Sequence, residues 1–123
     1  MGDSNRFDKS THGGYPMTDY IQVTTVTASQ KEAENIARAL LETRLAGCIQ
    51  IFGPISSTYW WQGTIESAQE WVCQIKTSHQ LYPRVEATIR RLHSYQVPEI
   101  LASPVIAGNP DYLKWLDGEL AKA

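Results

Sequence analysis

The stretch from Cys48 to Ser78 constrains the fold more than any other part of the sequence. It contains two strand-like arms on either side of Gln62-Gly63, a dipeptide typical of tight hairpin turns because glycine adopts positive φ without steric cost. The second arm alternates at the strand period of two, with Trp71, Cys73 and Ile75 on one face. Each arm would extend roughly 45 Å at about 3.3 Å per residue, which is longer than the body of a small domain.

The far end of this hairpin predicts self-association. Tyr59, Trp60 and Trp61 lie directly before the turn. A two-stranded ribbon is marginally stable in water, and an exposed aromatic patch favours association. The rest of the chain is too short to cover this end after packing the body, so we expect other copies of the chain to cover it in a closed ring.

Composition limits the classes of partner. The 123 residues suggest one domain, and the net charge of −2 without a basic run argues against a nucleic-acid partner. No apolar stretch approaches the roughly 20 residues that span a bilayer, so no membrane partner is expected. The N-terminus lacks an apolar signal core and the two cysteines do not make a disulfide framework, which together predict a cytoplasmic protein.

The pattern along the chain predicts an α+β fold. Residues 1–18 are polar and aperiodic and read as a flexible N-terminal tail, and residues 19–123 read as a single domain. Strands are expected at residues 20–26 and 100–106, and helices after the capping-box sequence 29–32 and after Ser78. Gly53-Pro54 predicts a bulge or bend in the first hairpin arm, and Asn109-Pro110 predicts an extra C-terminal helix. The order βαββαβ is that of a ferredoxin-like sandwich with both helices on one face of the sheet.

Metal-ligating residue types are present without the spacing of a known site. Cys48, Cys73, His79 and His93 form no paired-cysteine or His-x-x-x-His motif. Packing is the favoured role of both cysteines. For the histidines, helix capping is at least as good an interpretation as metal binding. If a metal is bound across a subunit contact, thiolate and imidazole favour copper or zinc.

A second candidate site is a cleft that binds a small molecule. Polar side chains near the arms and before the last strand, together with two tip aromatics, could line a pocket between subunits; they are Lys76, Glu66, Glu70, Tyr95, Glu99, Trp60 and Trp61. Salt bridges and hydrogen bonds within a subunit interface are the favoured alternative. No catalytic array is evident, so the chain is not expected to be an enzyme and needs no obligatory cofactor.

Several ordered motifs resemble those of the CutA divalent-cation tolerance proteins. They are LAGCIQI at 45–51, the YWWQG tip at 59–63, IKT at 75–77, HSYQVPE at 93–99 and DYLKWL at 111–116. The resemblance covers residues 20–120. It implies a ferredoxin-like fold, a homotrimer, kinship with PII-type signalling proteins and a role in tolerance to divalent metals, chiefly copper.

Most ligands of the metal site implied by that resemblance are absent from this sequence. Bacterial relatives are credited with a copper site of one cysteine at the end of the first strand and two adjacent histidines at the end of the second helix. The corresponding positions here are Thr25, Leu92 and His93, so only His93 is retained. We therefore expect copper, if bound, to contact His93 and Cys48. The alternative is a PII-like sensor that binds a small molecule or a partner protein in the cleft between subunits.

Overall fold

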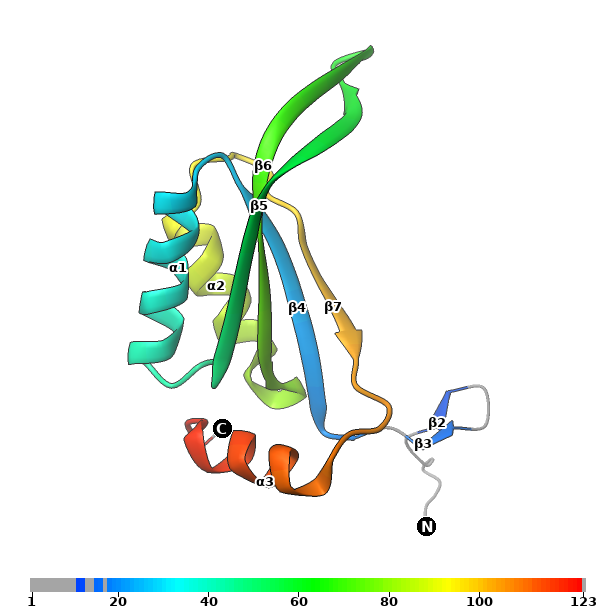
Figure 1. Ribbon diagram of the computed structural model, residues 1–123, viewed down its shortest axis with the longest axis vertical. Coiled ribbons are helices and arrows are strands. Elements are labelled where there is room, and N and C mark those ends of the chain that lie inside the picture. The colour runs from blue at the N-terminus through cyan, green and yellow to red at the C-terminus, as the bar shows by residue number, and fades with distance from the viewer. Residues whose placement is uncertain (1–10, 13–14, 17, 123) are drawn as a thin grey trace.

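The computed structural model describes residues 11–12, 15–16 and 18–122 (Figure 1). Most of the predicted N-terminal tail, residues 1–18, lies outside the described residues. Two short strands fall within it, β2 (Thr11–His12) and β3 (Tyr15–Pro16), and they pair antiparallel.

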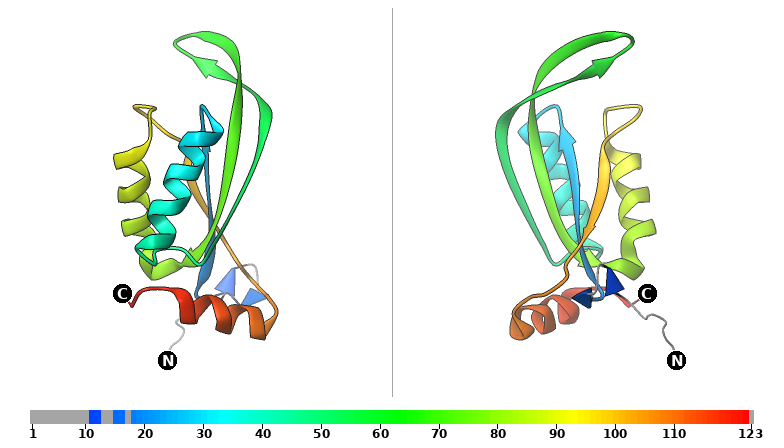
Figure 2. Two further views of the ribbon diagram at one scale, coloured as in Figure 1. Left: turned by 60° about the vertical axis from the view of Figure 1, so that its left-hand side comes forward. Right: turned by 90° about the vertical axis from the view of Figure 1, so that its right-hand side faces the viewer.

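The rest of the chain forms one sheet with helices on one face. The elements in order are β4 (Tyr20–Thr27), α1 (Gln30–Glu42), β5 (Cys48–Trp61), β6 (Thr64–Ser78), the 3-10 turn η1 (His79–Leu81), α2 (Tyr82–Leu92), β7 (Ile100–Pro104) and α3 (Pro110–Glu119). The sheet order is β5-β6-β4-β7, with every neighbouring pair antiparallel. Helices α1 and α2 cover the same face (Figures 1 and 2). The predicted ferredoxin-like βαββαβ sandwich with a C-terminal helix is confirmed.

The helix starts follow the predicted local chemistry. Ser29 Oγ accepts the backbone N–H of Glu32 at 3.1 Å. The Glu32 carboxylate returns to the backbone N–H of Ala28 at 3.2 Å, one residue earlier than in a standard capping box. Asn109 caps α3 by accepting the N–H of Asp111 at 2.9 Å.

The core lies between the sheet and the two helices. Its fully buried side chains come from alternate positions of the central strands and from one stripe of each helix; they include Val23, Ile36, Leu40, Cys73, Ile75, Val85 and Ile89. This is the amphipathic pattern expected for a sheet with one covered face. The opposite face is open over much of its area, since Phe52 and Leu101 on it are 47% and 63% exposed, but Val26 and Val72 at one end of it are buried.

The C-terminal helix α3 closes one end of the sandwich rather than the open sheet face (Figure 1). Leu116 and Leu120 join the core, and a Cβ at Gly47 would come within 2.6 Å of Leu116 Cδ1. Glycine at position 47 therefore permits the close packing of α3. Strand β7 ends at Pro104 rather than at the predicted residue 106, in keeping with the absence of a proline N–H.

The hairpin of β5 and β6 divides into two halves. We call residues 48–52 and 71–78 the inner half, where β6 pairs with β4 as well as β5, and residues 55–70 the outer half, where β5 and β6 pair only with each other. The register shifts between Phe52 and Ile55, which confirms the predicted bulge. At the turn, Gln62 and Gly63 have φ of 49° and 82°.

Candidate functional site

A cleft of about 650 Å³ lies where the outer half of the hairpin meets the connector between α2 and β7, residues 93–99. Its walls come from the end of β4, both hairpin strands and the connector; the lining residues are Val26, Ser57, Thr58, Tyr59, Trp61, Glu66, Glu70, Tyr95, Gln96, Val97 and Glu99. The outer half curves over this end of the sheet (Figure 2). The volume is that of a small-molecule site, since such pockets measure roughly 300–1,000 Å³.

A buried carboxylate and a phenol join two walls of the cleft. Glu70 on β6 pairs with Ile55, directly beyond the bulge of β5. It is only 5% exposed, and its Oε2 accepts the O–H of Tyr95 at 2.8 Å. Burial and then the hydrogen bond to Glu70 raise the pKa of Tyr95. Tyr95 therefore remains a neutral donor and leaves the charge of Glu70 uncompensated.

The connector is fastened to the body by His93. This side chain is fully buried. Its Nε2 donates to the carbonyl of Val26 at 2.7 Å, and its Nδ1 accepts the N–H of Tyr95 at 3.0 Å. An amide N–H only donates and a carbonyl only accepts, so in these contacts Nε2 is the donor and Nδ1 the acceptor.

Glu32 adds a second fastening for the same connector. Its Oε2 accepts the backbone N–H of Ser94 at 2.6 Å and its Oε1 accepts the Ser94 hydroxyl at 3.1 Å. The residue that caps α1 thus also holds the start of the segment that forms one wall of the cleft. This double role explains why Glu32 stands at this position of the capping box.

The two predicted copper contacts do not lie together. Both ring nitrogens of His93 already bond backbone groups, so metal binding there would require those bonds to break. Cys48 pairs with Lys76 at one end of β6. Val26, whose carbonyl bonds His93, pairs with Val72, four positions away on the same strand. Four positions along a strand correspond to about 13 Å. Within the described part of the chain, no three His, Cys, Asp or Glu side chains form a group able to hold a metal ion.

The positions at which relatives are credited with copper ligands are built as core in this chain. Thr25 is 0% exposed, and Leu92 packs against the hydrophobic core. Thr25 Oγ1 is the one buried side-chain polar atom without a hydrogen-bond partner among the described residues. A single hydroxyl beside an aliphatic side chain is not a copper site.

Five of the seven predicted cleft residues line one cavity: Glu66, Glu70, Trp61, Tyr95 and Glu99. The other two do not. Trp60 is 72% exposed. Successive side chains of a strand point to opposite faces, so Trp60 points away from the face on which Trp61 lines the cleft. Lys76 lies at the Cys48 end of the sheet, where its Nζ donates to Gln50 Oε1 at 2.9 Å.

Sequence reasoning named Glu70 among the polar groups near the hairpin but did not single it out as the buried centre of the cleft. The aliphatic wall of Val26 and Val97 was missed as well. The bulge at Gly53-Pro54 was the available signal, since bulges redirect neighbouring side chains and Glu70 pairs with Ile55 directly beyond it.

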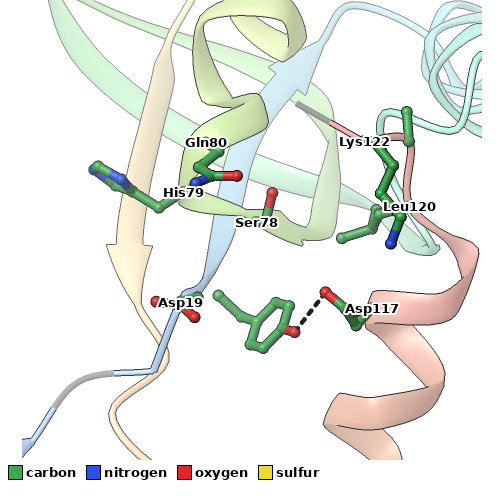
Figure 3. Close-up of a pocket in the computed structure, with 9 residues that line it drawn as sticks. Asp19, Ser78, His79, Gln80, Asp117, Leu120 and Lys122 are labelled. Carbon is green, nitrogen blue, oxygen red and sulfur yellow. Dashed lines mark hydrogen bonds between the residues drawn. The ribbon is translucent and has the colours of Figure 1, made fainter.

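A smaller hollow of about 370 Å³ lies at the opposite end of the sheet, beside α3 (Figure 3). Tyr20 donates its O–H to Asp117 Oδ1 at 2.9 Å there, and Asp19, His79 and Lys122 also line it. Burial, followed by the hydrogen bond to Asp117, raises the pKa of Tyr20 to about 12. This hydrogen bond fastens α3 to β4, and the mixed charges of the hollow favour no particular ligand.

Known proteins share both the sequence and the fold of this chain. Residues 21–119 match the family described as CutA1 divalent ion tolerance protein. The divalent-cation tolerance protein CutA of Archaeoglobus fulgidus is 41% identical over 101 residues, covering 82% of this chain and 96% of that one. The Cut A1 structure from Thermus thermophilus has a TM-score of 0.81 at 37% identity and covers 83% of this chain and 99% of its own.

A more distant relative retains the same fold. The CutA1 crystal structure from Oryza sativa gives a TM-score of 0.84 at 29% identity, covering 87% of this chain and 98% of that one. In the described residues of the present chain, no helix is both long and apolar enough to span a bilayer. The shared motifs, the long hairpin and the fold agree, and the chain belongs to the CutA1 divalent ion tolerance family.

Proposed function

We propose that this chain serves divalent-cation tolerance as a homotrimeric, PII-like sensor that binds a small ligand in the cleft around Glu70 and Tyr95. One observation carries the proposal. The cleft has the volume of a ligand site and a buried, hydrogen-bonded carboxylate at its centre, whereas the described residues provide no group of three metal ligands. Tolerance would then follow from sensing rather than from storing the metal.

The exposed surface of the hairpin supports the trimer. Trp60, Trp61 and Ile65 are 72%, 49% and 62% exposed on a ribbon of only two strands. Large exposed apolar groups on a marginal element are stabilised by burial against another protein surface. Further copies of the chain would both cover the ribbon and complete the walls of the cleft.

A thermal-shift screen tests the sensor. Metabolites are added with a metal chelator present, and divalent metals are added alone. We expect at least one metabolite to raise Tm without metal, because a ligand that binds only the folded state stabilises it. The shift should be lost in Glu70→Gln and kept in Glu42→Gln, which removes an exposed carboxylate at the far end of α1. A response to metals alone would contradict the sensor.

Direct copper binding at Cys48 is the second candidate. Cys48 is a free, half-buried thiol. Burial is the largest cause of the raised pKa of the Tyr112 phenol, and its contact with Cys48 raises that pKa further. Binding of Cu(I), measured by titration, should then be weaker in Cys48→Ser. It should be weaker in His93→Ala only if the connector opens. Copper binding that is unchanged in both variants would eliminate these contacts.

The two thiols also support a reducing, cytoplasmic location. Both Cys48 and Cys73 are free, and they lie on opposite faces of the sheet. They cannot form a disulfide bond with each other in this fold, so both would remain without an internal disulfide in an oxidising compartment. The Archaeoglobus fulgidus relative is described as periplasmic, and fractionation of cells that express the present chain would test the location.

A further inference from the structure

The cleft has a one-sided charge. Three carboxylates line it, those of Glu66, Glu70 and Glu99, and no Lys, Arg or His is among the described residues that form its walls. Such a surface attracts cations and repels anions, and its field is strengthened by the low-dielectric walls. Anionic metabolites are therefore poor candidates for this site.

Glu70 indicates where the positive charge would sit. The residue is only 5% exposed, and the Tyr95 hydroxyl supplies the one hydrogen bond that the described residues give its carboxylate. A buried charge with a single neutral donor is costly unless a cation approaches it. The cleft opens directly onto this carboxylate, since Glu70 and Tyr95 both line it.

The remaining walls suit an organic cation better than a metal ion. Tyr59, Trp61 and Tyr95 present aromatic rings, which attract ammonium and guanidinium groups, and Val26 and Val97 add aliphatic surface. A metal ion would need several oxygen ligands at one point, and the described carboxylates do not converge into such a group. A hydrocarbon body carrying a spread positive charge matches both kinds of wall.

We propose that the cleft binds a small organic cation of the aliphatic amine or guanidine class, with its charged nitrogen against Glu70 and its hydrocarbon part against Trp61 and Val97. The inference rests on the proposed function, which makes this cleft the ligand site. It adds the chemical class of the ligand.

Isothermal titration of the full-length protein with putrescine and with agmatine tests the proposal, with butanediol as the uncharged match for putrescine. We expect saturable binding of at least one amine and none of butanediol. Glu70→Gln should weaken binding about tenfold to a hundredfold, as loss of a charge-assisted contact predicts. Glu42→Gln, which removes the same charge from an exposed site at the other end of α1, should change binding less than about twofold.

Two further variants keep the proposal falsifiable if Glu70→Gln does not fold. Glu66→Gln and Glu99→Gln each remove an exposed carboxylate that lines the cleft and should each weaken amine binding severalfold. Equal affinity for amines in wild type, Glu70→Gln and Glu99→Gln would overturn the proposal, as would the absence of amine binding. If amines fail but an anionic or neutral metabolite gives a Glu70-dependent thermal shift, the proposed function stands and this inference falls.

Discussion

Both halves of the hairpin are antiparallel strand pairs, but they lie in opposite environments. In the inner half, β6 is flanked by β5 and β4, and Cys73, Ile75 and Thr77 are 0% exposed beneath the helices. In the outer half β6 has one partner strand, and Ile65 is 62% exposed. The inner half is held by the core of its own chain, whereas the outer half is held by ladder hydrogen bonds, by the turn and, at its base, by the Glu70–Tyr95 hydrogen bond.

One long β-ribbon thus serves two purposes in this fold. The inner half is a structural strand pair, and the bulge after Phe52 marks the point at which that role ends. Directly beyond the bulge, Glu70 turns into a cleft instead of a core. The least stabilised element of the fold therefore carries the candidate site, as is common for binding elements.

The largest expected effect separates the two halves by stability. Ile75→Ala should lower the free energy of unfolding by about 2–5 kcal/mol, because it leaves a cavity in the core. Ile65→Ala, the same type of change in the outer half, should cost no more than about 0.5 kcal/mol in a dilute, dissociated sample. Urea unfolding followed by circular dichroism measures both. Equal losses would show that the outer half is as well packed as the inner half.

The second effect concerns assembly and acts on the outer half alone. Replacing Trp60 and Trp61 together by alanine should weaken subunit association by about 2 kcal/mol or more, because buried aromatic residues dominate protein interfaces. Sedimentation velocity over a range of concentrations measures the change. The matched control is Trp115→Ala, an aromatic residue on α3 that is 46% exposed and remote from the hairpin tip. An intact trimer in the double variant would contradict the proposed assembly.

A third prediction uses two threonines that face the core. Thr77 Oγ1 donates to the carbonyl of Leu45 at 2.6 Å, and Thr77→Val should cost about 1–2 kcal/mol. Thr25 Oγ1 has no partner among the described residues, and Thr25→Val should stabilise the fold by about 1 kcal/mol, since it removes an unpaired buried hydroxyl. Thermal unfolding of both variants decides the matter, and destabilisation by Thr25→Val would indicate that the hydroxyl finds a partner in solution.

The smallest effect distinguishes the two thiols of the inner half. Burial, and then the nearby charge of Glu32, raise the pKa of the Cys73 thiol to about 11. Alkylation of the folded protein at pH 8 should therefore modify Cys48 and spare Cys73, because only the thiolate reacts. Mass spectrometry of the labelled peptides measures this.

The same raised pKa gives a pH dependence of stability. The contribution of the protonated Cys73 thiol is complete below the unfolded-state pKa near 9 and is lost as the pH rises through about 11. Wild type and Cys73→Ala should therefore differ most in Tm below pH 9 and converge above it. A gap that widens between pH 9 and 11 would have the opposite sign to this linkage.

Much of the fold could be predicted because its signals are local. The capping residue Ser29, the helical spacing after it, the turn at Gln62-Gly63 and the break at Gly53-Pro54 each depend on a few neighbouring residues. Element order then restricts the topology, since right-handed crossovers place both helices on one face. The end of β7 shifted by two residues, which is the usual uncertainty at a boundary.

The candidate site could be predicted only in part. Five residues were expected together and line one cleft: Glu66, Glu70, Trp61, Tyr95 and Glu99. Lys76 and Trp60 were expected there and lie elsewhere. A strand alternates its side chains and extends about 3.3 Å per residue, so closeness in sequence does not imply a shared cavity. Which side chains meet depends on the curvature of the ribbon and the path of the connector.

Local sequence patterns specify the element order, the helix caps, the bulge and the solvent-exposed aromatic tip, because backbone sterics and hydrophobic periodicity act over short distances. The burial of Glu70 against Tyr95, and the bonding of both His93 nitrogens to backbone groups, follow instead from how the folded domain packs. The Glu70–Tyr95 and His93–Val26 contacts join residues that lie 25 and 67 positions apart in the chain. Their partners are selected by packing of the whole domain, and no local pattern specifies them.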